Sequence, residues 1–135
     1  MGKKGQFHEH IFSRIKKGEY PLFDIVVEFV KILEEESQHE KYSNQKQNFQ
    51  RSVTTAELDN RLKNYGINTS RYNIGRVVTT LLKMCEIVYL PKNRGSNSSC
   101  YSQVTYSYEK LKELMELIEK VRGEKIMSGI TDLFS

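Results

Sequence analysis

The chain has 135 residues, of which 38% are hydrophobic, enough for one modest core. No run approaches the roughly 20 consecutive apolar residues of a membrane-spanning helix. The basic start of the chain, residues 1–6, is not followed by the apolar segment of a secretory signal. We therefore expect the two cysteines to be reduced thiols, and the sequence predicts a cytoplasmic protein without a membrane contact.

The net charge of +4 is concentrated in the middle of the chain. Residues 51–100 carry eight Lys or Arg and three Asp or Glu, whereas residues 1–50 carry eight of each. Residues 101–135 carry five basic and six acidic side chains. A localised basic segment is the electrostatic pattern of a phosphate-binding surface. It also fits an ordinary solvated surface, so the charge alone leaves both interpretations open.

Apolar spacing predicts two helices in the first part of the chain. The first is short and amphipathic, contains Phe7 and Ile11, and ends near Gly18. Pro21 opens the second helix, which runs to about Ser37 with apolar residues at i, i+3, i+4 and i+7. The polar residues 38–50 predict an exposed loop or a frayed helix end.

From residue 52 onwards the pattern alternates between helices and β-prone segments. A short β-prone stretch precedes a helix that Thr54 or Thr55 caps and Gly66 ends. The remaining expected elements are a helix over 70–84 capped by Ser70, strands over 86–90 and 101–106 around a polar turn at 91–100, a helix over 108–122 and a tail over 123–135.

This order of elements resembles the winged helix-turn-helix regulators of bacteria and archaea. The matching segments are 55–58 opening the first helix, 65–67 at the turn, 70–82 as the second helix and 91–100 where the family has its wing. The resemblance covers about residues 52–106. It implies a mainly α fold with a small β-hairpin (α+β), with helices flanking the core. The divisions are a helical extension and polar loop (1–50), the winged core (51–106), a packing or dimerisation helix (107–122) and a tail (123–135).

The helix over 70–84 is the candidate recognition helix. An α-helix fits the major groove of DNA, where arginine can bind guanine and asparagine can bind adenine. The free N–H groups of a first turn suit a phosphate. The candidate DNA-binding residues here are Thr69, Ser70, Arg71, Tyr72, Asn73 and Arg76. The alternative is an ordinary solvated helix face.

The turn between the last two strands is the candidate wing. In the resembled family such loops touch phosphates or the minor groove, and the residues for this contact are Lys92, Asn93, Arg94, Ser96 and Asn97. The alternative is a plain β-turn with a solubilising charge. Arg51, Arg61 and Lys63 are further candidates for phosphate contacts, although a solvated charge is the more common role for each.

The last helix and the tail are candidates for protein contacts. A coiled-coil-like stripe predicts a homodimer through Leu111, Leu114, Met115, Ile118 and Val121; its alternative is packing within the chain's own core. The tail resembles the clamp-binding peptides of archaeal and eukaryotic replication proteins, which implies a sliding-clamp contact through Ile130, Leu133 and Phe134. Its alternatives are a tail docked on a neighbour and a disordered end.

Signatures of catalysis are missing from the sequence. There is no glycine-rich phosphate loop and no GxSxG motif, and His8 and His10 lack a third spaced metal ligand. We expect no enzyme activity, no cofactor and no metal. The predicted function is sequence-specific binding of double-stranded DNA as a transcriptional regulator. The alternative is a winged-helix interaction module, or a replication or segregation accessory factor, that binds a partner through its flanking helices or tail.

Overall fold

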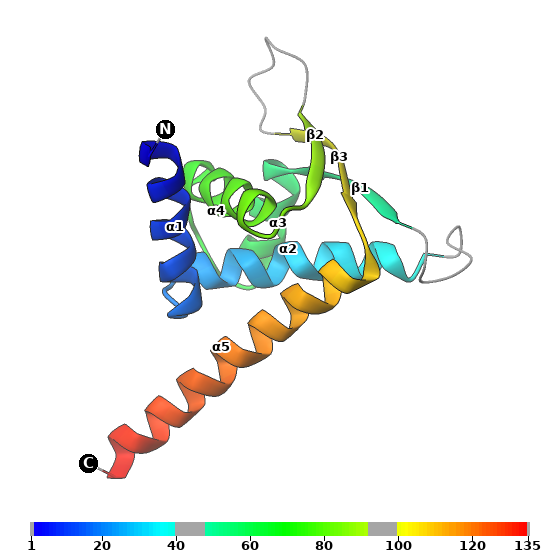
Figure 1. Ribbon diagram of the computed structural model, residues 1–135. Helices are drawn as coiled ribbons and strands as arrows, with labels where there is room; N and C mark the ends of the chain where they lie inside the picture. Colours follow the sequence, from blue (N-terminus) through cyan, green and yellow to red (C-terminus); the bar gives the residue numbers. More distant parts are fainter. Residues whose placement is uncertain (1, 40–47, 92–99, 135) are drawn as a thin grey trace.

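The computed structural model describes residues 2–39, 48–91 and 100–134, with side chains described over 6–39, 48–89 and 103–127. The protein is mainly helical with a small antiparallel sheet (Figure 1). The elements in chain order are α1 (Gly2–Lys16), α2 (Leu22–Ser37), β1 (Phe49–Thr54), α3 (Thr55–Asn64), α4 (Arg71–Met84), β2 (Val88–Pro91), β3 (Cys100–Tyr106) and α5 (Tyr108–Phe134). Among these described helices none has both the length and the apolar character that crossing a membrane requires.

Helix α2 is the centre of the core. It packs against α1, α3, α4, α5 and β1, and Figure 1 shows it crossing the middle of the molecule. Its buried residues are Leu22, Phe23, Ile25, Val26, Glu28, Phe29, Val30, Ile32 and Leu33. Full burial of one such large apolar side chain stabilises the fold by about 1.5–3 kcal/mol, so the neighbours of α2 are held mainly by apolar contact.

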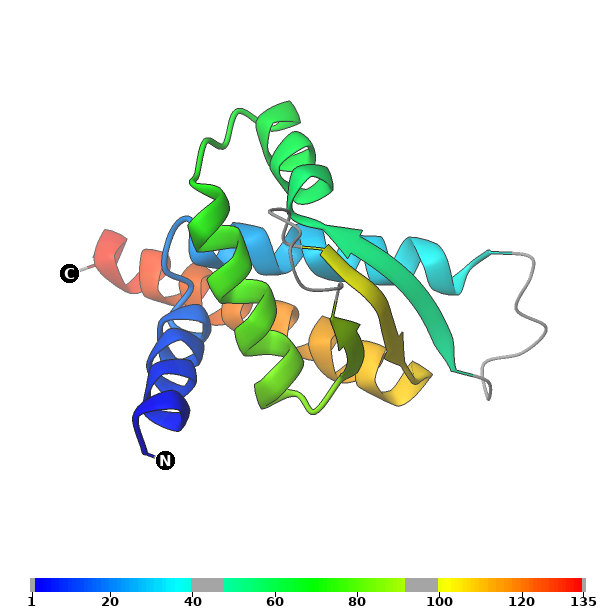
Figure 2. The same ribbon diagram turned by 90° about the horizontal axis from the view of Figure 1, so that it is seen from above.

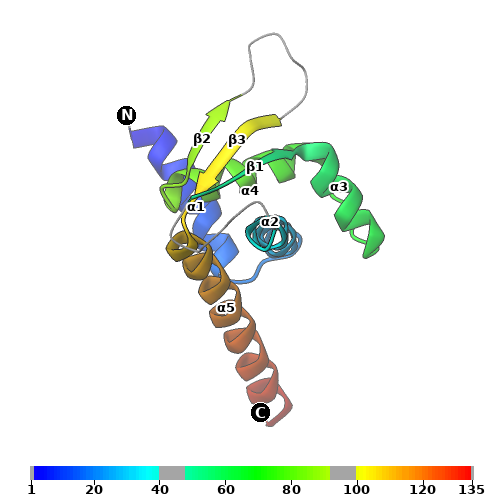
Figure 3. The same cartoon turned by 90° about the vertical axis from the view of Figure 1, so that its right-hand side faces the viewer.

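The sheet has the strand order β1-β3-β2, and both pairings are antiparallel. Phe49 pairs with Tyr106 at one end of the β1–β3 ladder, and their rings lie 5.5 Å apart. The Tyr106 hydroxyl donates a hydrogen bond of 2.5 Å to the Leu33 carbonyl oxygen. This bond ties the sheet to the last part of α2, while the β2–β3 hairpin stands out beside α4 (Figures 1 and 3).

Side-chain caps begin α3 and α4, as the sequence predicts. Thr54 accepts a hydrogen bond from the Glu57 N–H, and Ser70 accepts one from the Asn73 N–H. Gly66 follows α3 with φ of +75°, and the next N–H donates back to the Leu62 carbonyl. This left-handed closure favours glycine, so α3 stops there and α4 begins in a new direction.

Three predicted boundaries are wrong. The strand expected from residue 86 begins at Val88, after Glu86 with its left-handed φ of 55°. Residues 49 and 50, expected in a loop, belong to β1, because Phe49 is buried and the strand pairs with β3. The expected tail from residue 123 continues α5 to Phe134. One physical reason is the anchor beyond Gly123, where the Lys125 ammonium donates a 2.9 Å hydrogen bond to the Gly18 carbonyl. This contact holds the next turn of α5 against the end of α1.

Replacement of Phe29 by alanine tests the central role of α2. Phe29 is fully buried, so Phe29→Ala should lower the free energy of unfolding by about 3–5 kcal/mol. Chemical denaturation followed by circular dichroism measures this change. Val88→Thr, at a site that is 67% exposed, is the control and should change it by less than about 0.5 kcal/mol. Equal effects at the two sites would contradict the assignment of the core.

Candidate nucleic-acid interface

One face of α4 is buried in the core, and the opposite face is partly covered by α1. Its buried residues are Ile74, Val77, Val78, Thr80, Leu81 and Leu82. Tyr72, Arg76, Thr79 and Lys83 follow each other at spacings of three and four residues, which places them together on the opposite face. The helix contains three basic residues and no acidic residue. Its outer face therefore carries the type of charge that attracts a polyanion.

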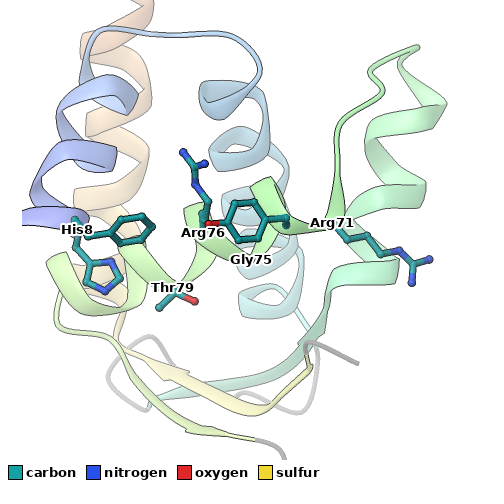
Figure 4. Close-up of a pocket in the computed structure, with 7 residues that line it drawn as sticks. His8, Arg71, Gly75, Arg76 and Thr79 are labelled. Carbon is teal, nitrogen blue, oxygen red and sulfur yellow. The ribbon is translucent and has the colours of Figure 1, made fainter. Parts of the chain in front are cut away.

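Arg71 and Tyr72, two of the predicted recognition residues, are both largely exposed. The Arg71 side chain is 67% exposed, and Tyr72 is 69% exposed. The Arg71 Nε lies 3.6 Å from Oδ2 of the buried Asp59 on α3, which also pairs with the Lys63 ammonium at 3.2 Å. Asp59 thus lies next to the Nε side of Arg71, and Figure 4 shows the guanidinium end pointing away from the centre of α4.

Thr69, Ser70 and Asn73 form the cap of α4. Ser70 accepts from the Asn73 N–H at 3.1 Å, and the Asn73 side-chain amide donates to the Thr69 hydroxyl at 3.1 Å. Asn73 and Thr69 are half-buried. One donor of the predicted adenine-reading amide is therefore already used within the turn, so a base contact by Asn73 competes with its capping role.

Arg76 lies between two aromatic rings. Its guanidinium carbon is 5.3 Å from the ring centre of Tyr72 and 5.9 Å from that of Phe7 on α1. Arg76 is half-buried, and its Nε is buried without a hydrogen-bond partner among the described residues. A buried donor without a partner costs about 1–3 kcal/mol. The guanidinium is thus held in place with one donor unused.

Helix α1 lies beside α4, which the sequence did not indicate. The two helices pack side by side (Figure 2), and His8 Nδ1 lies 3.2 Å from the buried Thr80 hydroxyl. An open hollow of about 320 Å³ lies between them, lined by Phe7, His8, Arg71, Tyr72, Gly75, Arg76 and Thr79 (Figure 4). Four of these, Phe7, His8, Gly75 and Thr79, were not among the predicted site residues. No local signal identified them, because α1 and α4 are far apart in the sequence.

Two arginines expected to be available for phosphates are paired with carboxylates. Arg51 makes a bidentate contact with Glu57 at 2.6 and 3.0 Å. Arg61 contacts Glu35 at 2.7 and 3.2 Å, and its Nε lies 3.3 Å from the buried Glu28. The hydrogen bonds from Arg61 lower the pKa of Glu35. These arginines join α3 and β1 to α2 and must give up these pairs before they can bind a phosphate.

The predicted dimerisation stripe is mostly part of the chain's own core. Leu111, Leu114, Ile118 and Val121 are buried within the single chain, and only Met115 is exposed. The alternative of packing within the core therefore describes these four residues, and a dimer seam made of them is wrong. The reason is that α5 packs along α2, which uses the same apolar face.

Two groups of predicted residues lie outside the described side chains. The wing residues Lys92, Asn93, Arg94, Ser96 and Asn97 fall outside the described ranges. Ile130, Leu133 and Phe134, predicted for a sliding clamp, lie in the helical backbone of α5, in the part whose side chains are not described.

The contact of His8 with α4 predicts a dependence of stability on pH. Burial, followed by the charge of Lys83, lowers the pKa of His8 below 6.5. The neutral imidazole makes its full contribution to stability above the pKa that His8 has in the unfolded chain. This contribution is lost as the pH falls through the lower pKa of the folded protein, because the unfolded chain binds the proton first. Between about pH 7.5 and about pH 5.5 the wild-type melting temperature should fall more than that of His8→Gln. The control is His10→Gln, on the exposed side of the same helix; identical pH profiles of wild type and His8→Gln would refute the prediction.

Comparison with known proteins identifies no relative. No protein-family model, no curated protein and no solved structure matches this chain. The function is therefore inferred from the chemistry of α4 and the elements around it.

Proposed function

We propose that this chain is a winged helix-turn-helix protein that binds double-stranded DNA in a sequence-specific manner, as a transcriptional regulator does. The succession β1–α3–α4–β2–β3 and the strand order β1-β3-β2 are those expected of a winged helix. In this arrangement α4 is the recognition helix, and the hairpin beside it is the wing. The observation that carries the proposal is the acid-free outer face of α4, with Arg71 and Tyr72 exposed at its leading end.

The geometry of α4 suits the major groove. The groove admits one helix, and its base edges are read by side chains near the helix start. Arg71 lies in the first turn with its terminal nitrogens directed outward, while its Nε lies beside Asp59. A side chain held at one end loses less freedom on binding. Arg71 is therefore our candidate for bidentate contact with a guanine.

Alanine substitutions on α4 test this function. Arg71→Ala and Arg76→Ala should each weaken binding to the preferred duplex by about 1–3 kcal/mol, and Arg71→Ala should also relax the preference at one base pair. The preferred duplex comes from selection against random DNA, and affinity is measured by fluorescence anisotropy. The matched control is Arg122→Ala on α5, whose guanidinium pairs with Glu119. If both α4 variants bind every duplex as the wild type does, α4 is not the recognition helix.

A salt titration separates DNA binding from the alternative of a protein-interaction module. Each phosphate contact should lower the logarithm of the association constant by about 0.9 for each tenfold increase in salt. Apolar contact with a protein partner hardly responds to salt. A flat salt profile for duplex binding would contradict contact with the phosphates.

The end of α5 favours a second copy of the chain as a protein partner. Helix α5 extends away from the body of the molecule (Figures 1 and 3), and Ile126 and Met127 there are each 63% exposed. We therefore propose that two copies pair through this extended end, which fits the two-fold symmetry common among DNA-binding proteins.

Introduction of a charge at the end of α5 tests the homodimer. Ile126→Glu should convert a dimer to a monomer, because it places a carboxylate in the apolar contact. Sedimentation equilibrium measures the mass of the wild type and of the variant. Glu116→Gln, at an exposed site on the body-packed part of α5, is the control and should leave the mass unchanged. A monomeric wild type at high concentration would refute the dimer.

A further inference from the structure

The hollow between α1 and α4 combines features of a binding site for an anion. Arg76 and Arg71 are among its lining residues, although the Arg71 guanidinium points away from the other lining residues (Figure 4), and the described side chains that line it include no carboxylate. The Arg76 Nε is buried without an acceptor among the described residues. Because guanidinium groups bind phosphates through charge-assisted hydrogen bonds, the Arg76 guanidinium can hold an anion in the hollow.

Gly75 lies on the wall of the hollow, inside a helix where glycine is unfavourable. A Cβ atom built at this position would meet nothing within 4 Å. The glycine is therefore not required by packing within the chain. Glycine is the residue that lets a ligand approach a backbone closely, so its position favours an occupant that comes near α4 at this point.

Arg71 and Arg76 differ in which parts of a DNA duplex their guanidinium groups can contact. The Arg71 side chain is largely exposed at the helix start, whereas Arg76 is half-buried and held between the rings of Phe7 and Tyr72. A guanidinium restrained in this way cannot extend freely to a base edge, but it is pre-organised for an anion that enters the hollow.

We propose that the hollow receives one phosphate of the DNA backbone, bound by Arg76 and placed against Gly75, with Phe7 and His8 of α1 as its second wall. This inference rests on the proposed DNA binding and makes α1 a part of the interface. Arg76 is then a phosphate contact and not a base reader. Removal of the Arg76 side chain should therefore weaken binding to all duplexes by a similar factor. Removal of the Arg71 side chain should weaken binding by a factor that depends on the DNA sequence.

Filling the hollow is the first test. Gly75→Leu should fold with a melting temperature at or above that of the wild type, because it replaces a helix-interior glycine in open space. It should weaken duplex binding by at least about tenfold, because the side chain occupies the space of the phosphate. Gly123→Leu on α5 is a matched control, since a Cβ there also meets nothing within 4 Å, and it should bind DNA as the wild type does. Unchanged affinity of a folded Gly75→Leu overturns the proposal.

Neutral phosphates identify the contact directly. Methylphosphonates are placed one at a time in the preferred duplex, and each duplex is titrated with the wild type and with Arg76→Ala. At one position the methylphosphonate should weaken DNA binding by the wild type by about tenfold. It should leave binding by Arg76→Ala nearly unchanged, because the variant no longer contacts that phosphate charge. If the methylphosphonate at every position weakens the binding of both proteins by the same factor, Arg76 contacts no phosphate.

A last measurement separates the failure of this site from the failure of DNA binding. If the wild type binds duplex DNA and Gly75→Leu binds it equally well, the hollow is refuted and the proposed function stands. If the wild type binds no duplex, inorganic pyrophosphate is titrated while the backbone amide signal of Gly75 is followed by nuclear magnetic resonance. A saturable shift that Arg76→Ala abolishes would support an anion site in the hollow even though the protein binds no DNA. The absence of a shift would refute both the anion site and the proposed DNA binding.

Discussion

The burial of α2 is the interaction on which the rest of the structure depends. Helix α2 packs against every other described helix and against β1, so it is the element that holds these neighbours together. Helix α4 packs against α2 and α1 with six of its residues buried, and it turns its remaining face outward. That outward face contains no acidic residue, and the proposed interface follows from this division of α4 into two sides.

The basic character of the middle segment has two distinct structural origins. Arg51 and Arg61 are neutralised by carboxylates of α2 and α3 and act as links between elements. Arg71 and Arg76 lie on α4, where Arg71 shares the Asp59 carboxylate with Lys63 and Arg76 packs against aromatic rings. A count of charges treats the four residues alike, whereas the positions of the neighbouring carboxylates decide which of them can attract a distant anion.

Helix α1 changes the nature of the interface. It lies along α4 and brings Phe7 and His8 to a site otherwise made of recognition-helix residues. Phe7 restrains Arg76 on the side of α4 that faces α1. The two arginines of α4 thereby acquire different environments, one largely exposed beside Asp59 and one packed against rings, and this difference is the basis for assigning them different contacts with DNA.

The sequence alone determined the helices α2, α3 and α4, the cap of α4 at Ser70 and the stop of α3 at Gly66, because periodicity and capping act within a few residues. It left Thr54 and Thr55 as alternatives for the cap of α3. The tertiary structure decided the features that need distant partners. Phe49 joins a strand only because β3 lies beside it. Beyond Gly123, helix α5 contacts the chain at the end of α1 through Lys125. Its apolar residues between Leu111 and Val121 pack mostly in the core. The second wall of the candidate site comes from α1, whose contact with α4 joins segments about seventy residues apart. Neither segment carries a local sequence pattern that predicts this contact.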